Sequence, residues 1–307
     1  MSIGKLFHVL HAGSDFDALN GLYERLFSPW HGMMEQRHSP RERRVGSLLV
    51  VADSVVEIAA PSDDEGAQAA AIGRFVTKFG PRWHSLAWYC HDVAAASDRL
   101  RSAGVRVLGP AGDRLGEGPA EGDVYTHPKD TGTQLELYQP PASVGGPQGS
   151  GPFPDPRFEP GWPRRWAERA NPAGVERLAW VTVVVGDLGR AVGLWTEGVG
   201  GCVIHEGESE LLGTKSAYVA VGPETVVELA TPTGTGPAAG DLATFGDTLH
   251  SVTFGVANLD ATAAHLSEVG VAIIGRDDMT LMANPADTLG AAMRFTTWRV
   301  PGDPRHD

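Results

Sequence analysis

The alternation of hydrophobic and polar positions follows the same order four times along the chain. Each repeat begins with a short alternating strand, continues through a polar turn and an amphipathic helix, and ends with three strands, the last of which is strongly apolar. The closing strands are SVVEIAAP, TQLELYQP, TVVELATP and AAMRFTTW. This order predicts an α+β fold in which the later strands of each βαβββ repeat pair antiparallel.

Each predicted helix follows a residue that can cap its first backbone amides. In the first repeat Asp15 precedes a helix expected over residues 16–27, and Asp92, Asp187 and Asn258 take the same position in the other repeats. Because a single helix does not cover the sheet of one repeat, we expect the repeats to pair two by two.

A stretch rich in proline and glycine separates the second repeat from the third. This composition is typical of a linker. We therefore divide the chain into a first domain at residues 1–142, a linker at residues 143–171 and a second domain at residues 172–307. Trp162 and Trp166 are expected to anchor the linker to a domain surface, because aromatic residues in long connections usually pack.

Four side chains with the chemistry of metal ligands occupy matching positions in the first domain. His8 and His84 lie in the opening strands of the first two repeats, and Glu57 and Glu136 lie in their closing strands. Glu136 stands between two leucines, where burying a carboxylate is costly without a cation. Each of the four could also be an ordinary core or rim residue, but their shared position in the repeats favours one common site. Two imidazoles and two carboxylates suit a divalent metal such as Zn, Ni, Co, Mn or Fe(II).

The second domain interrupts this pattern. Trp180 replaces the opening histidine and Arg294 replaces the closing glutamate, while Glu228 and His250 remain. A cation in that place argues against a second metal. We expect Arg294 to neutralise Glu228, or the domain to serve as a scaffold, and an anion pocket at Arg294 is the alternative.

Four βαβββ units with His in the opening strand and Glu in the closing strand resemble the vicinal oxygen chelate superfamily. This superfamily includes glyoxalase I, methylmalonyl-CoA epimerase, bleomycin-resistance proteins and extradiol dioxygenases. The segment HVLHAGSDFDALNGLYERLF resembles the opening strand and helix of the superfamily, and THPKDTGTQLELYQ is similar to the ending of methylmalonyl-CoA epimerases. The resemblance implies two glyoxalase-like domains with cupped mixed sheets, the second of them degenerate.

The resemblance also implies a site and a reaction. One divalent metal ion would be held by His8, Glu57, His84 and Glu136, a set similar to that of metal-dependent glyoxalases. The implied function is that of an isomerase, epimerase or lyase that abstracts a proton alpha to a carbonyl through a metal-chelated enediolate. Glu136 is the first choice for the residue that carries the proton, and Glu57 the second. A CoA thioester is one candidate substrate.

Two alternative functions remain open at this stage. In an extradiol-type Fe(II) dioxygenase, His8, His84 and Glu136 would form a triad of two histidines and one carboxylate. The additional acidic residue Glu57 disfavours that interpretation. The other alternative is a non-catalytic binding or resistance protein that sequesters a small molecule. Such relatives usually lack the metal ligands, so the metal content of the protein would distinguish this alternative from an enzyme.

Charge and hydropathy limit the partners. The formal net charge of −13 argues against unspecific binding to nucleic acid, which needs a basic face. No window approaches the roughly 20 apolar residues of a membrane helix, and the N-terminus lacks the pattern of a secretory leader. We therefore expect a cytoplasmic protein with a small-molecule substrate and no nucleic-acid or membrane partner, and a homodimer is left open. The basic run at Arg41, Arg43 and Arg44 is expected to be a solvated turn, with contact to CoA phosphates as the alternative.

Overall fold

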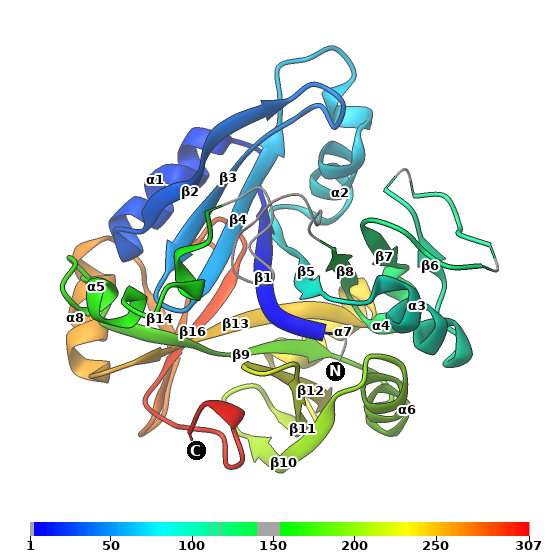
Figure 1. Cartoon of the computed structure of the whole chain (residues 1–307). Helices are drawn as coiled ribbons and strands as arrows, with labels where there is room; N and C mark the ends of the chain where they lie inside the picture. Colours follow the sequence, from blue (N-terminus) through cyan, green and yellow to red (C-terminus); the bar gives the residue numbers. More distant parts are fainter. Residues whose placement is uncertain (1–2, 111, 117, 140–153, 307) are drawn as a thin grey trace.

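Two eight-stranded sheets dominate the computed structural model, which describes residues 3–110, 112–116, 118–139 and 154–306 (Figure 1). The first sheet has the order β2-β3-β4-β1-β5-β8-β7-β6 and the second the order β10-β11-β12-β9-β13-β16-β15-β14. The strands of the first sheet are β1 (Ile3–Ala12), β2 (Trp30–Ser39), β3 (Arg44–Val51), β4 (Ser54–Pro61), β5 (Arg82–Cys90), β6 (Val107–Leu108), β7 (Val124–Thr126) and β8 (Gln134–Tyr138). Those of the second are β9 (Val175–Val184), β10 (Cys202–Ser209), β11 (Thr214–Val221), β12 (Thr225–Pro232), β13 (Thr248–Val256), β14 (Ile273–Arg276), β15 (Thr280–Ala283) and β16 (Ala292–Thr296).

Each sheet joins two sequence repeats through their opening strands. β1 pairs antiparallel with β5, and each of these strands pairs in parallel with the closing strand of its own repeat. β9, β13, β12 and β16 are arranged in the same way. The predicted α+β fold of paired βαβββ repeats is therefore confirmed. The registers also match between the sheets: Leu10 lies beside Glu57 as Thr182 lies beside Glu228, and Ala87 lies beside Glu136 as Thr253 lies beside Arg294.

The four predicted helices begin at the expected caps. Asp15, Asp92, Asp187 and Asn258 each accept a hydrogen bond from the backbone amide three residues later. The helices are α1 (Phe16–Phe27), α3 (Val93–Ser102), α6 (Leu188–Gly193), which continues into a π-helical turn at Leu194–Gly198, and α8 (Leu259–Glu268). Local capping chemistry was thus sufficient to locate these helix starts.

Two further helices, α2 (Ala71–Phe79) and α7 (Pro237–Phe245), were not predicted. Each links the two repeats of its sheet. Ile72, Phe75 and Val76 of α2 pack on β1 and β4. The remaining short segments are α4 (Pro128–Thr131), α5 (Trp162–Ala167) and 3-10 turns at Ala67–Ala69, Pro156–Phe158 and Pro304–His306. No helix among the described residues is both long and apolar enough to cross a membrane.

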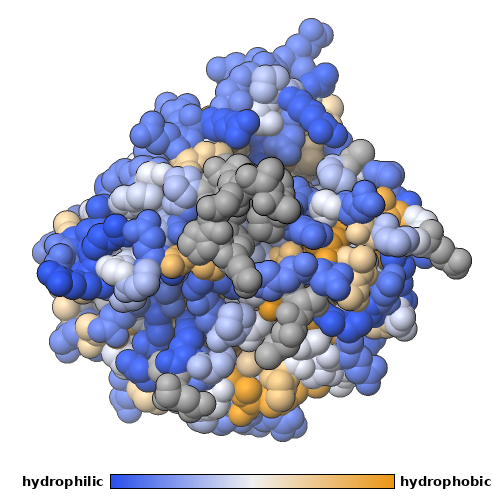
Figure 2. Space-filling model, viewed as in Figure 1, coloured by the Kyte–Doolittle hydropathy of each residue, from blue (hydrophilic) through white to orange (hydrophobic). Residues whose placement is uncertain are grey.

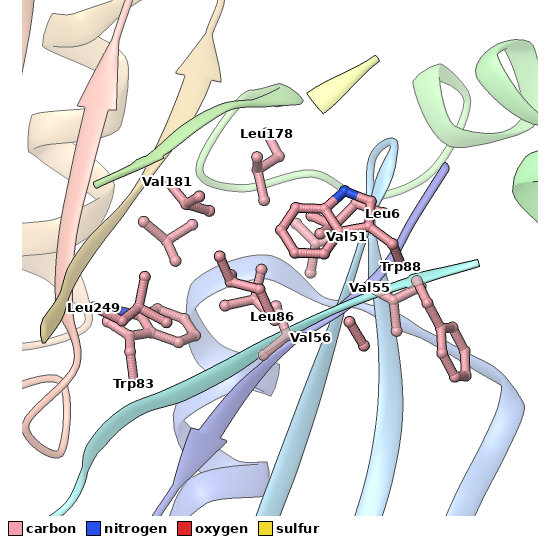
Figure 3. Packing of buried hydrophobic residues seen from close by; sticks show 14 of the residues in the cluster. Leu6, Val51, Val55, Val56, Trp83, Leu86, Trp88, Leu178, Val181 and Leu249 are labelled. Carbon is pink, nitrogen blue, oxygen red and sulfur yellow. The ribbon is translucent and has the colours of Figure 1, made fainter. Parts of the chain in front are cut away.

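The two sheets pack against each other through one face, shown in Figure 3. Val56 and Leu86 of the first sheet face Val181 and Leu249 of the second, and all belong to one hydrophobic cluster. The indole of Trp83 also donates a hydrogen bond across the interface, 2.8 Å long, to the carbonyl of Ala292. Successive strand residues point to opposite faces. Glu57 and Ala87, which follow Val56 and Leu86, therefore lie on the other face of the first sheet, here called the site face.

The second half of the linker is packed against the protein. Trp162 and Trp166 are buried, and their indoles donate hydrogen bonds of 2.6 Å to the carbonyl of Ala52 and of 2.8 Å to that of Val175. Their predicted anchoring role is confirmed. Residues 143–153 of the predicted linker lie outside the described residues, and the exact domain boundaries stay a prediction.

The surface seen in Figure 2 is mostly hydrophilic, with small apolar patches that are separated from one another. The large hydrophobic side chains that are exposed in the described residues are Val203, Ile274 and Met279. This face therefore presents mainly polar groups to solvent, in keeping with the acidic composition.

Candidate metal site

Three of the four predicted site residues meet on the site face. His8 lies opposite Ala87 across the β1–β5 pair, and Ala87 lies beside Glu136. The Nε2 atom of His8 is 3.0 Å from Oε2 of Glu57 and 3.9 Å from Oε2 of Glu136. The imidazole of His8 is thus held between two carboxylates that are 79 residues apart in the chain (136 − 57).

His84 approaches the same group from β5. The β1–β5 ladder passes from Ser85 to Trp83 and skips His84, so the residue sits in an irregularity that can re-aim its side chain. Its ring packs edge-on against Phe75 of α2, with 4.5 Å between ring centroids. Burial lowers the pKa of His84 to about 4, against the opposing charge of Glu57. The imidazole is therefore neutral at pH 7 and keeps a free lone pair.

Several ring nitrogens of these histidines are buried and have no well-aligned hydrogen-bond partner in the part of the chain that the structure describes. They are both nitrogens of His8 and Nδ1 of His84. Nε2 of His8 lies 3.0 Å from the carboxylate of Glu57. Buried polar atoms are normally satisfied, and imidazole nitrogens beside carboxylates are suitable donors for a divalent cation. The chemistry of the donor set therefore fits a metal, although the described residues contain no group of three His, Cys, Asp or Glu side chains already arranged around one point.

Arg44 is the site residue that the sequence analysis missed. Its Nη1 atom donates to Oε1 of Glu57, and its Nε atom donates to Glu42 over 2.7 Å. The expectation of a solvated turn holds for the exposed Arg41 and Arg43 but is wrong for Arg44, which begins β3. The run Arg-Val-Gly-Ser-Leu contained the signal, because Arg44 alternates onto the same face as Leu48, which lies opposite Glu57.

Gly46 lies between Arg44 and Leu48 on the site face, beside the contact of Arg44 with Glu57. A Cβ atom at Gly46 would lie 3.7 Å from both Nη1 of Arg44 and Oε1 of Glu57, and 3.2 Å from the carbonyl of Ile58. The two 3.7 Å distances are ordinary van der Waals contacts, and of these three only the approach to the carbonyl of Ile58 is tight.

The two glutamates differ in charge state because their neighbours differ. Burial alone would raise the pKa of Glu57, but the charges of Arg44 and His8 outweigh it and hold that pKa well below its usual range. Burial raises the pKa of Glu136 to about 7, with the charge of Glu57 adding to the rise and His8 opposing it. Glu136 accepts no hydrogen bond from the described residues, and its side chain is 17% exposed against 6% for Glu57. Glu57 is therefore a fixed anion, whereas Glu136 is a carboxyl group free to exchange a proton.

Tyr125 lies directly opposite Glu136 across the β7–β8 pair. Burial raises the pKa of its hydroxyl, and the nearby carboxylates of Glu136 and Asp123 raise it further. The phenol therefore stays protonated and can donate a hydrogen bond toward the site face.

The equivalent place in the second sheet is closed by hydrogen bonds. Arg294 donates to Glu228 over 2.6 Å, which confirms the prediction that this arginine neutralises the carboxylate. Four more side chains donate to Glu228: the indole of Trp180 and the hydroxyls of Thr182, Ser216 and Tyr218. With both oxygens satisfied, Glu228 has no need of a metal. His250 is turned away to Asp241, with 2.8 Å between Nδ1 and Oδ2.

Comparison with known proteins agrees with this architecture. A model of the Glyoxalase/Bleomycin resistance protein/Dioxygenase superfamily matches residues 177–287. Residues 177–287 are therefore a domain of this superfamily. The matched residues lie in the second domain, where the predicted ligand set is broken, so the superfamily match concerns the fold and not the ligands. The vicinal oxygen chelate resemblance drawn from the repeats is confirmed.

One relative and two solved structures are similar to this chain over different lengths. The ethylmalonyl-CoA/methylmalonyl-CoA epimerase of Cereibacter sphaeroides is 29% identical over 142 residues, which are 45% of this chain and 98% of the relative. A mutant of 4-hydroxymandelate synthase from Streptomyces coelicolor covers 99% of this chain and 98% of its own, with a TM-score of 0.64 and 13% identity. The methylmalonyl-CoA epimerase of Mycobacterium tuberculosis covers 40% of this chain and 88% of its own, with a TM-score of 0.38 and 23% identity. The two-domain arrangement is thus shared over the full chain with the synthase.

Proposed function

We propose that this protein is a divalent-metal-dependent isomerase, epimerase or lyase that removes a proton alpha to a carbonyl, with the ion held by His8, Glu57, His84 and Glu136. The observation that carries the proposal is the buried imidazole of His8, which lies within 4 Å of both carboxylates. A cation would satisfy these groups together.

The surroundings of each site residue suggest a different role for it in the proposed reaction. A divalent ion in this place would act as a Lewis acid toward a carbonyl oxygen of the substrate. His8 and the neutral His84 would supply lone pairs, and Glu57 the permanent negative charge. Glu136 would carry the proton, because it is the carboxylate without a hydrogen-bond donor among the described residues and the more exposed of the two. The protonated hydroxyl of Tyr125 beside it would donate to an oxygen of the substrate.

A CoA thioester is the substrate class that we propose to test first. Support comes from the epimerase relative, whose name specifies ethylmalonyl-CoA and methylmalonyl-CoA and whose length is covered almost entirely by this chain. Such a thioester has an acidified α-proton next to a carbonyl, as the proposed reaction requires.

The function is tested by proton exchange. Protein loaded with Co²⁺ and incubated with methylmalonyl-CoA or ethylmalonyl-CoA in deuterated water should incorporate deuterium at the α-carbon, as followed by mass spectrometry. The exchange should stop when a chelator removes the ion and return when Co²⁺ is added back. Absence of exchange on any thioester, with the metal bound, would count against the proposal.

One observation favours a second candidate, an Fe(II) dioxygenase. Arg44 already engages Glu57, and if that pair persists, the residues left for a metal are His8, His84 and Glu136. Two histidines and one carboxylate form the ligand set of many non-haem Fe(II) oxygenases. Oxygen consumption by the Fe(II)-loaded protein in the presence of catechols, without α-proton exchange, would support this candidate.

A further inference from the structure

We infer that Arg44 competes with the metal for Glu57: it neutralises this carboxylate in the metal-free protein and must withdraw toward Glu42 when the ion binds. The inference rests on the proposed function, because it assumes that Glu57 is a ligand. It assigns to Arg44 the role of a positioning residue that sets the metal affinity of the site.

The guanidinium group is held between two carboxylates in different surroundings. Nη1 donates to Glu57, whose side chain is 6% exposed, and Nε donates to Glu42, whose side chain is 52% exposed. Arg44 itself is 22% exposed. It can therefore give up the buried partner without losing every counter-charge, because Glu42 and solvent remain on its other side.

Electrostatics make the two cations rivals. Glu57 points Oε1 at Arg44 and Oε2 at His8, so a metal bound through Oε2 would share one small carboxylate with a guanidinium. The metal ion and the guanidinium of Arg44 would both contact this one carboxylate, and two positive charges that close together repel strongly where bulk water is excluded. The approach of the ion thus weakens the hold of Arg44 on Glu57, and a firm hold of Arg44 weakens the binding of the ion.

The second domain provides an internal comparison. Its Arg294 also neutralises the glutamate of the closing strand, but the guanidinium is buried, with a side chain 4% exposed, and forms an ion pair with no second carboxylate among the described residues. Glu228 is held by four other donors as well. Arg294 therefore stays on Glu228 and takes the place of a metal, whereas Arg44 can move away from Glu57 toward Glu42 and solvent.

The test is a titration of metal-free protein with Co²⁺, monitored by calorimetry and by visible absorption. Thermal melts of the metal-free protein are measured alongside. Arg44→Met should bind Co²⁺ about 10-fold or more tightly than the wild type, because the charge-assisted hydrogen bond from Arg44 to Glu57 no longer has to be broken when the ion binds. The same change should lower the melting temperature of the metal-free protein, because Glu57 loses its buried partner. A purely structural role of Arg44 would lower both the stability and the affinity, so the opposite signs distinguish the two. Arg41→Met, which removes an exposed arginine in the same hairpin, is the matched control and should leave both unchanged.

A second variant tests the movement of Arg44 toward Glu42 and leaves the ion pair between Arg44 and Glu57 intact. Glu42→Gln removes the outer partner of Arg44 and should weaken Co²⁺ binding, whereas Glu35→Gln, an exposed carboxylate on β2, should not. If the wild type binds one Co²⁺ and neither Arg44→Met nor Glu42→Gln alters its affinity, the competition is refuted while the metal site stands. If neither the wild type nor Arg44→Met binds Co²⁺, the proposed function fails with it.

Discussion

Replacement of Glu136 by glutamine is expected to lower the rate of α-proton exchange by about 10²- to 10⁴-fold, the usual contribution of a positioned general base. The amide keeps the shape of the side chain and one oxygen donor but cannot take up a proton. Of the two carboxylates near His8, only Glu136 is without a hydrogen-bond donor among the described residues. The measurement is deuterium incorporation into the thioester at saturating Co²⁺.

Glu57→Gln separates the proton carrier from the ligand. This variant should bind Co²⁺ more weakly, because the fixed negative charge is lost, yet it should retain most of the exchange once the ion is saturating. The assignment would be reversed if Glu57→Gln lost the exchange under those conditions and Glu136→Gln kept it.

Replacement of Arg294 by methionine is expected to lower the free energy of unfolding by about 3–5 kcal/mol, the range found when one partner of a buried ion pair is removed. Glu228 is fully buried, and Arg294 is its one cationic partner among the described residues. The four neutral donors that remain do not cancel its charge. Urea denaturation followed by tryptophan fluorescence measures the loss.

The double variant Arg294→Met with Glu228→Gln is the control. Removing the charge on both sides leaves a neutral amide among hydroxyl and indole donors, so much of the lost stability should return. If Arg294→Met lowered the free energy of unfolding by less than about 1 kcal/mol, as for an exposed ion pair, the proposal that Arg294 is the buried counter-charge of Glu228 would be contradicted.

The fold could be predicted from local patterns because the repeats carry their own signals. Alternating strands and capped amphipathic helices depend on neighbours within a few residues, and Asp15 and Asn258 marked helix starts that the structure confirms. The π-helical turn after α6 and the helices α2 and α7 were missed. In α2 the spacing of Ile72, Phe75 and Val76 did indicate a helix, but the segment is short and lies between repeats.

The site was predictable only as far as the repeats are symmetrical. Equivalent positions singled out His8, Glu57, His84 and Glu136, and the matching sheet registers place the glutamates as expected. Arg44 has no counterpart in that scheme. Its contact with Glu57 depends on the register of β3 against β4, which is a property of the folded sheet.

Buried polar contacts between distant segments were likewise beyond local reasoning. Arg157 of the predicted linker is buried against Asp155 and donates to the carbonyls of Leu6 and Phe7 in β1, about 150 residues away. Nothing in a Pro-rich connector indicates such a partner. These hydrogen bonds hold β1, the strand that carries His8, in place.

The metal content of the protein tests the central claim most directly. Elemental analysis of protein saturated with Co²⁺ and freed of excess ion should find one ion per chain in the wild type. His84→Ala should lose the ion while remaining folded, and His31→Ala, which changes a partly exposed histidine, should retain it. A wild type without stoichiometric metal would contradict the account and favour a non-catalytic binding protein, and a His84→Ala variant that keeps its ion would place the metal elsewhere.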